Sequence, residues 1–208
     1  ANSTVYTMQV TTMGYITVKG TLNATWQTNV YGNGLITLNE DAKFNTAALH
    51  LTGQDYNGRD NTDADRVGKP AEIIVNAGAN FVVGSVKSSN GADYSYNSSK
   101  GINIGTKEGK YAILNINGGD VEIHMANGQN VNIGAGGTVN IGASTMKTIC
   151  RTENGTVGII NDGTINFSEL SAELHTAQAG LNVTTTVEGY AVKYVGGVYK
   201  LVANMVVN

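Results

Sequence analysis

The feature that most constrains the fold is a run of short segments between Gly109 and Gly142 that tight-turn residues separate. Tyr111–Asn117 and Asp120–Met125 alternate apolar and polar residues, and Gly118-Gly119 stands between them. Alternation with a period of two is typical of half-buried strands, and Gly or Asn supplies the positive φ of tight turns. The segment therefore predicts strands joined by sharp corners.

Near-identical copies of one motif recur in this region. Val131–Gly134 reads VNIG, Val139–Gly142 repeats it, and Ile102–Gly105 is a near copy. An irregular repeat of strand and turn is typical of solenoids, in which strands stack about 4.8 Å apart and share one core. We expect equivalent positions of the copies to stack in register, with Asn ladders at matching turns. These patterns predict an all-β fold, a single-chain parallel β-helix with protruding loops. The alternative is an antiparallel β-sandwich, because Asn-Gly and Gly-Gly are also hairpin turns.

The chain divides into a predicted β-helix body, 1–167, and a C-terminal segment, 168–208, that caps it or interacts. In the C-terminal segment, Ser168–Gln178 predicts one short helix, with Ser168 as N-cap and Gly180 as the stop. Tyr190–Val195 and Val198–Val202 predict a terminal β-hairpin around Gly196-Gly197. In the body, two polar stretches predict loops, and short apolar runs predict further strands: loops at 54–69 and 88–101, strands at 6–11, 15–18, 35–38, 48–51, 73–75 and 81–83.

Composition excludes several classes of protein. The net charge of −3 argues against a nucleic-acid partner, which requires concentrated Lys and Arg. No apolar run approaches the roughly 20 residues that span a bilayer, so we expect no membrane insertion. Charged residues are only 14% and Gly residues number 27, which favours strands and turns and suits an extracellular or cell-surface protein. The opening Ala1-Asn2-Ser3 predicts a mature chain after signal-peptide removal.

No recognisable catalytic motif is present, so the sequence predicts no enzyme, no catalytic residue and no cofactor. One acidic loop has oxygen ligands at alternate positions, which suits Ca²⁺ weakly, but Arg59 takes a ligand position and a solvated loop is the alternative. Tyrosines in the two polar loops are weak candidates for glycan contact. The calcium candidates are Asp55, Asn57, Asp60, Asp63 and Asp65, and the glycan candidates are Tyr56, Tyr94 and Tyr96.

Leu114–Val121 and Val131–Gly142 resemble the secreted right-handed parallel β-helix proteins of bacteria, the passenger domains of autotransporter-type adhesins and related surface proteins. The resemblance is compositional and covers about a third of the chain. It implies an adhesive or structural role, and for a minority of such proteins polysaccharide cleavage. No residue of this chain matches a catalytic motif of that family.

The leading functional prediction is a secreted structural protein, a subunit that assembles end to end into an extracellular fibre or surface layer through β-strand edges. Its partner would be a second copy of the chain. The alternative is an adhesin or glycan-binding module. A polysaccharide lyase or hydrolase is a third prediction, and it requires acidic and basic side chains on consecutive coils of one face, which strands 102–142 hardly supply. The predicted subunit interface consists of Val5, Tyr6, Met8, Val10, Leu201, Met205 and Val207.

Overall fold

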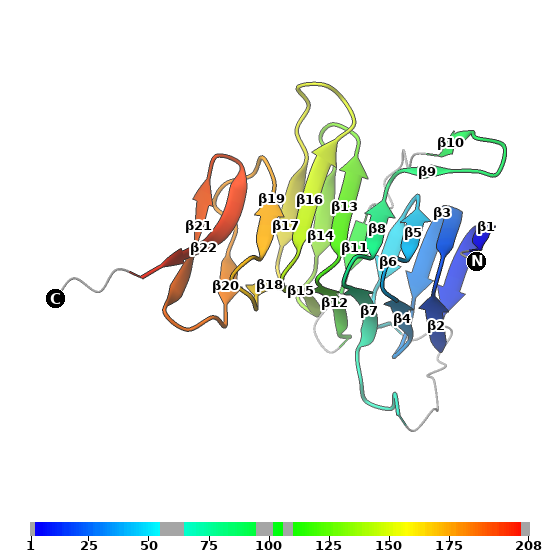
Figure 1. The fold of residues 1–208 in the computed structure, drawn as a ribbon, viewed down its shortest axis with the longest axis horizontal. Helices are drawn as coiled ribbons and strands as arrows, with labels where there is room; N and C mark the ends of the chain where they lie inside the picture. The colour runs from blue at the N-terminus through cyan, green and yellow to red at the C-terminus, as the bar shows by residue number, and fades with distance from the viewer. Residues whose placement is uncertain (1–2, 55–64, 95–101, 106–109, 205–208) are drawn as a thin grey trace.

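The computed structural model describes residues 3–54, 65–94, 102–105 and 110–204, and these residues form an all-β protein with mostly parallel sheets. The strands are stacked along the long axis of the molecule, and strand β1 and the hairpin of β21 and β22 lie at opposite ends of that axis (Figure 1). Antiparallel pairing between described strands is confined to two hairpins and one contact of the second hairpin. The antiparallel sandwich alternative is therefore wrong.

The smaller of the two main sheets has seven strands, all parallel. Its order follows the sequence, so each strand lies further along the axis than the one before it. The strands are β2 (Tyr15–Val18), β4 (Leu35–Leu38), β7 (Ala71–Asn76), β12 (Ala112–Asn117), β15 (Gly137–Ile141), β18 (Thr164–Phe167) and β20 (Val183–Thr185).

The larger sheet has 13 strands and bends at its longest member, β3 (Thr21–Val30). The first half of β3 pairs with β5 and the second half with β6, so the sheet divides at β3 into two arms. One arm runs from β3 through β5 (Lys43–Thr46), β8 (Asn80–Val83), β13 (Asp120–Met125), β16 (Thr145–Cys150), β19 (Glu173–His175) and β22 (Val198–Ala203) to β21 (Tyr190–Val195). The other runs through β6 (Leu49–Leu51), β11 (Ile102–Ile104) and β14 (Asn130–Ile133) to β17 (Gly158–Asn161), and β1 (Thr4–Thr12) pairs with β3.

Strands that follow each other along the chain from β11 to β19 do not pair with each other. Instead β12 pairs with β15 and β15 with β18, β13 pairs with β16 and β16 with β19, and β14 pairs with β17. Earlier strands from β4 on follow the same order once the small two-stranded sheet of β9 (Val86–Lys87) and β10 (Asp93–Tyr94), which projects from the stack, is left aside (Figure 1). From β4 to β16 each partner is the third main-sheet strand further along, whereas β1 pairs with β3, β2 with β4, β3 with β5 and β18 with β20.

This interval corrects the expectation that all VNIG copies stack. Val131–Ile133 lies on β14 and Val139–Ile141 on β15, which belong to different sheets. The copy at Ile102–Ile104, by contrast, pairs in register with Val131–Ile133. The two copies that follow each other in the sequence therefore lie in different sheets, whereas the copies at 102–104 and 131–133, which are further apart in the sequence, lie side by side.

The core forms because apolar residues at equivalent positions lie directly above one another. In sheets with parallel registers, aligned side chains point to the same face, and here that face is buried. Phe44 and Phe81 illustrate this, since both are fully buried and their rings stack with centroids 5.2 Å apart. One continuous inward row of the larger sheet is Leu22, Phe44, Phe81, Val121, Met146, Leu174 and Tyr199.

Outward positions carry a polar ladder. On the seven-stranded sheet, Asn140 Nδ2 donates to Asn115 Oδ1 at 2.8 Å, and Asn115 Nδ2 donates to Glu72 Oε1 at 2.7 Å. On the larger sheet Asn132 Nδ2 donates to Asn103 Oδ1 at 3.1 Å. The expected Asn ladders therefore exist, but these two lie in the middle of strands and not at turns.

The predicted helix over Ser168–Gln178 is wrong. No helix occurs among the described residues, and this segment makes a turn followed by strand β19. Leu174 pairs with Met146 and is fully buried, whereas Leu170 on the supposed apolar face is 56% exposed. The free edge of β16 selects the extended conformation, because pairing buries Leu174 in the core and outweighs the weak local helix signal. The terminal hairpin is confirmed as β21 and β22.

Candidate functional site

The N-terminal end of the stack exposes a long strand edge. Among the described strands β1 pairs only with β3, so its outer edge has no strand beside it. Three of its apolar side chains are exposed, Val5 by 50%, Tyr6 by 47% and Met8 by 68%. The register shifts at Met8, where β1 and β3 bend together around the corner of the stack.

The sequence of this edge strand contains none of the residue types that oppose pairing with another chain. Residues 1–18 contain no Asp, Glu, Lys, Arg or Pro, and Lys19 is the first charged residue of the chain. Edge strands that must stay single usually carry charged residues or Pro, which oppose pairing with another chain. A nine-residue strand without them is therefore suited to pairing with a further strand.

Beside β1 the core opens into a hollow of about 310 Å³, lined among others by Val5, Ile16, Val18 and Leu22. Ile16 pairs with Ile36 and Val18 with Leu38, so β2 continues the inward rows of the seven-stranded sheet. No described strand lies beyond β2 to cover these side chains. Ser3, Thr17, Lys19 and Thr21 also line the hollow, and Val18 is buried, so the hollow exposes only part of the end of the hydrophobic core.

The C-terminal end is built differently, because the β21–β22 hairpin covers the core there. Tyr199 is buried and lies beside Leu174, and the Tyr194 and Tyr199 rings approach to 4.8 Å between centroids. The Tyr199 hydroxyl donates to Gln178 O at 3.1 Å and accepts from Leu181 N at 2.8 Å. This hydroxyl ties the hairpin to the connection between β19 and β20.

We expect Tyr199→Phe to lower the free energy of unfolding by about 1–3 kcal/mol, because it leaves the amide of Leu181 and the carbonyl of Gln178 without their partner. Urea unfolding followed by circular dichroism measures the loss. Tyr111→Phe, at a tyrosine that is 58% exposed on the side of the stack, is the control. Equal stability losses in both variants would contradict the role of the Tyr199 hydroxyl.

The hairpin also restores the strand direction of the stack. β22 is antiparallel to β19, and β21 is antiparallel to β22, so β21 runs parallel to β19 and to the strands before it. On the arm of the larger sheet that contains β5 and β19, the outermost strands are β1 and β21, and they therefore point the same way; the other arm ends at β17. In the seven-stranded sheet β2 and β20 also point the same way.

The structure places the predicted interface residues in several environments. Val5, Tyr6 and Met8 lie exposed on the free strand β1, but Val10 is only 8% exposed and belongs to the core. Leu201 is partly buried and packs against the core from β22. Met205 and Val207 lie outside the described residues.

The calcium and glycan candidates remain predictions. Asp65 is exposed, whereas Asp55, Asn57, Asp60 and Asp63 lie outside the described residues. No cluster of metal-ligating side chains occurs in the described part of the chain. Tyr94 is 46% exposed on β10, and Tyr56 and Tyr96 again lie outside the described residues.

Sequence reasoning missed a row of charged side chains on the larger sheet. Glu122 on β13, Lys147 on β16 and His175 on β19 occupy one register line on three successive strands. Lys147 Nζ lies 3.6 Å from Glu122 Oε1, and His175 Nε2 lies 2.7 Å from Glu173 Oε2. Lys147 and His175 follow residue 142 and therefore lie outside strands 102–142. Glu122 and Lys147 pair within the row and His175 pairs with Glu173 of its own strand, as expected of a solvated sheet face.

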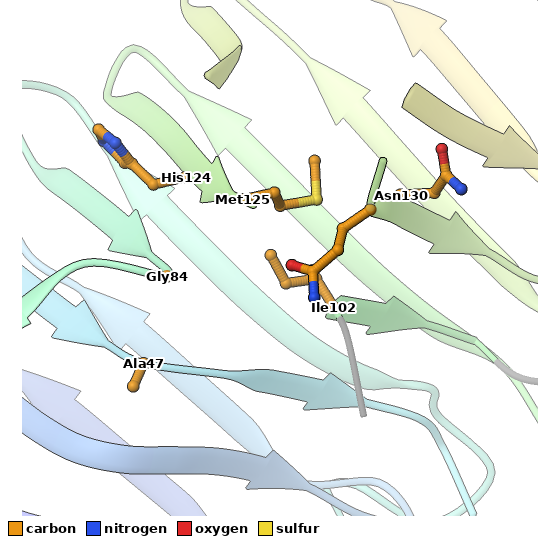
Figure 2. A pocket seen from close by; sticks show the side chains of 7 residues that line it. Ala47, Gly84, Ile102, His124, Met125 and Asn130 are labelled. Carbon is orange, nitrogen blue, oxygen red and sulfur yellow. The ribbon is translucent and has the colours of Figure 1, made fainter. Parts of the chain in front are cut away.

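The stack also contains an internal cavity, at the corner where β8 and β13 meet β11 and β14. Ala47, Gly84, Ile102, His124, Met125, Gln129 and Asn130 line it (Figure 2). Its volume is about 10 Å³, room for a single water molecule at most and far below the size of a ligand pocket.

Comparisons with known proteins add no identification: no family model, no curated protein and no solved structure matches the chain significantly. In the described part of the chain, no helix has the length and apolar character needed to cross a membrane.

Proposed function

We propose that the chain is a single-chain parallel β-helix and serves as an extracellular structural subunit that associates end to end into a fibre or surface layer. The coil is supported by the pairing interval, since β12, β15 and β18 stack on one face and β13, β16 and β19 on another. One strand per face per turn of chain is what a coil with three walls requires. The composition that suits an extracellular protein supports the location, as does the resemblance to bacterial β-helix proteins.

The observation that carries the functional proposal is the unprotected edge of β1. A free edge offers unpaired N–H and C=O groups, and exposed apolar side chains add a hydrophobic contribution when a second strand covers them. Because β1 and β21 point the same way, a second copy placed on the same axis meets β21 with β1 in the parallel sense. Such a head-to-tail contact does not close on itself and generates a filament.

The test is a lysine on the free edge. We expect the unmodified chain to form multimers in sedimentation velocity and filaments in electron micrographs, and Met8→Lys to shift it at least about tenfold toward monomer at equal concentration. Met8 is 68% exposed, so the substitution leaves the core intact. A lysine ammonium at this edge loses its hydration when a neighbouring strand covers it, and this cost opposes the contact between copies.

The matched control is Tyr111→Lys, which also replaces an exposed apolar residue, 58% exposed, but on the side of the stack. It should assemble like the unmodified chain. An unmodified chain that stays monomeric at high concentration with both ends intact would refute end-to-end assembly. If the Tyr111→Lys and Met8→Lys variants lose assembly equally, the contact between copies does not involve the free edge of β1.

A further inference from the structure

We propose that the corner between the seven-stranded sheet and the larger sheet binds a linear, uncharged glycan. An open pocket of about 670 Å³ lies at this corner, on the side of the stack, and its volume is in the range of ligand sites. Four successive connections between the two sheets line the pocket, those from β2 to β3, β4 to β5, β7 to β8 and β12 to β13. The lining residues are Lys19, Asn39, Glu40, Asn76, Ala77 and Asn117.

Four of these residues form a row with one member on each connection, which we call the corner row: Lys19, Asn39, Asn76 and Asn117. Asn76 and Asn117 are partners in the register of β7 and β12. Asn39 is level with Asn76, because the strand that ends before it, β4, pairs in register with β7. Asn39 N also donates to Val18 O at 3.0 Å, which places Asn39 beside Lys19. The row therefore runs along the stack and crosses three strand spacings, about 14 Å.

The corner row continues the outward positions of the seven-stranded sheet. The residues immediately before its members are buried in the core: Val18, Leu38, Val75 and Ile116. Because side chains alternate along a strand, the next position on each strand faces away from the core. Two of the connections close with the same turn, since Ala42 N donates to Asn39 O and Ala79 N donates to Asn76 O, both at 3.0 Å. The two amides therefore start from similar backbone positions.

The amides of the corner row are not used within the protein. In the described part of the chain, the side chains of Asn39, Asn76 and Asn117 make no hydrogen bond to another protein group. The ladder in the middle of the same sheet is different, because Asn140 and Asn115 donate their amide protons along it. Each side-chain amide has two N–H donors and an acceptor oxygen. The corner row therefore presents a line of donors and acceptors to the pocket.

The chemistry of the lining selects the class of ligand. One cation, Lys19, and one anion, Glu40, line the pocket, so their charges balance and neither an anion nor a cation is favoured. Ala77 is the single apolar residue among the described lining residues, so an apolar ligand would bury little apolar surface against the protein. A hydroxyl group both donates and accepts hydrogen bonds, as a side-chain amide does. The best match is therefore a neutral molecule rich in hydroxyl groups.

The spacing of the row selects a linear ligand. Neighbouring strands lie about 4.8 Å apart, which is close to the length that one pyranose ring adds to an extended β-1,4-linked glycan. Each ring of such a glycan therefore meets one connection, and the corner row has room for four rings. An α-1,4-linked glycan of the same sugar curves, so its successive rings leave the row.

The first test compares two tetrasaccharides of glucose on the whole chain by isothermal titration calorimetry, one β-1,4-linked and the other α-1,4-linked. We expect the β-1,4-linked tetrasaccharide to bind with a Kd of about 1 mM or tighter, and the α-1,4-linked one at least about tenfold more weakly. The two probes have the same hydroxyl-rich composition and differ in shape. Equal affinities would overturn the match between ring and strand spacing, and no binding of the β-1,4-linked probe would overturn the glycan site altogether.

The second test locates the glycan. The double variant Asn76→Ala, Asn117→Ala should raise the Kd of the β-1,4-linked tetrasaccharide at least about tenfold, a loss of about 1.4 kcal/mol. Thermal unfolding should be unchanged, because neither amide has a partner in the protein. Asn182→Ala, at an exposed asparagine before β20, is the matched control and should bind like the unmodified chain.

A double variant that binds as tightly as the unmodified chain would overturn the position of the site. Asn76 and Asn117 end β7 and β12, which lie two and three strands further along the sheet than β2. The double variant should therefore assemble like the unmodified chain in sedimentation velocity. Loss of glycan binding and loss of end-to-end assembly are thus separate results, and either proposal can fail without the other.

Discussion

Replacing Gly84 by Ala is expected to lower the free energy of unfolding by at least about 4 kcal/mol, a large part of the stability of a typical domain. Gly84 follows β8 at a corner and has a φ of +84°, a conformation that side chains with a Cβ rarely adopt. A Cβ here would lie only 1.9 Å from His124 O on the next turn of chain. The backbone of one of two stacked strands must therefore move, which disturbs their hydrogen bonds.

Gly128→Ala is the matched control, because Gly128 has a similar φ of +76° but a Cβ added there would meet no atom within 4 Å. It should cost only the backbone strain, about 1–2 kcal/mol. Urea unfolding of both variants, followed by far-ultraviolet circular dichroism, measures the difference. Equal losses would show that the close approach of the strands at Gly84 contributes nothing.

The second large effect is expected at Arg66, a charged residue of which only 5% is exposed. Its Nε donates to Asn33 O at 2.7 Å, its Nη1 lies 3.2 Å from Glu72 Oε2, and Nη2 donates to Pro70 O. The guanidinium fork thus joins the connection before β7 to the turn between β3 and β4. Arg66→Met should lower the free energy of unfolding by about 3–5 kcal/mol, because Glu72 Oε2 and the two carbonyls lose the guanidinium donor, while Glu72 Oε1 keeps only its bond from Asn115.

Two further variants separate charge from packing at this position. Lys69→Met removes an exposed cation nearby and should change stability by less than about 0.5 kcal/mol. Glu72→Gln in the Arg66→Met background removes the stranded carboxylate and should recover part of the loss in chemical denaturation. No recovery in the double variant would indicate that Arg66 acts through its packing alone.

The strands and the buried face were predictable from the sequence, because alternation requires only local information. Tyr15–Val18 and Leu35–Leu38 are strands with the predicted bounds, and the terminal hairpin is present. The incorrect prediction of a helix over Ser168–Gln178 could not be avoided from local sequence signals. Its N-cap, acidic first turn and Gly stop all favour a helix, and only pairing of Leu174 with Met146, which lies in a distant segment, decides for a strand.

The site was predictable only in part, for a physical reason. The exposed apolar residues Val5, Tyr6 and Met8 follow from an uncharged N-terminal strand, but that Val10 turns into the core depends on the bend shared with β3. The hollow depends on sheets that end at different heights, and the direction of β21 depends on two successive reversals. Those are properties of the pairing order, which alternation along one strand does not encode.

The stacking of strands along the long axis determines how the molecule would respond to mechanical tension. Hydrogen bonds between neighbouring strands run along the stack, and the first and last described strands, β1 and β22, lie toward its opposite extremities (Figure 1). A pulling force applied through the chain ends is therefore parallel to these bonds and opens them one strand at a time, as in a zipper. Shear geometry, in which many bonds must break together, arises only when the force acts across the stack.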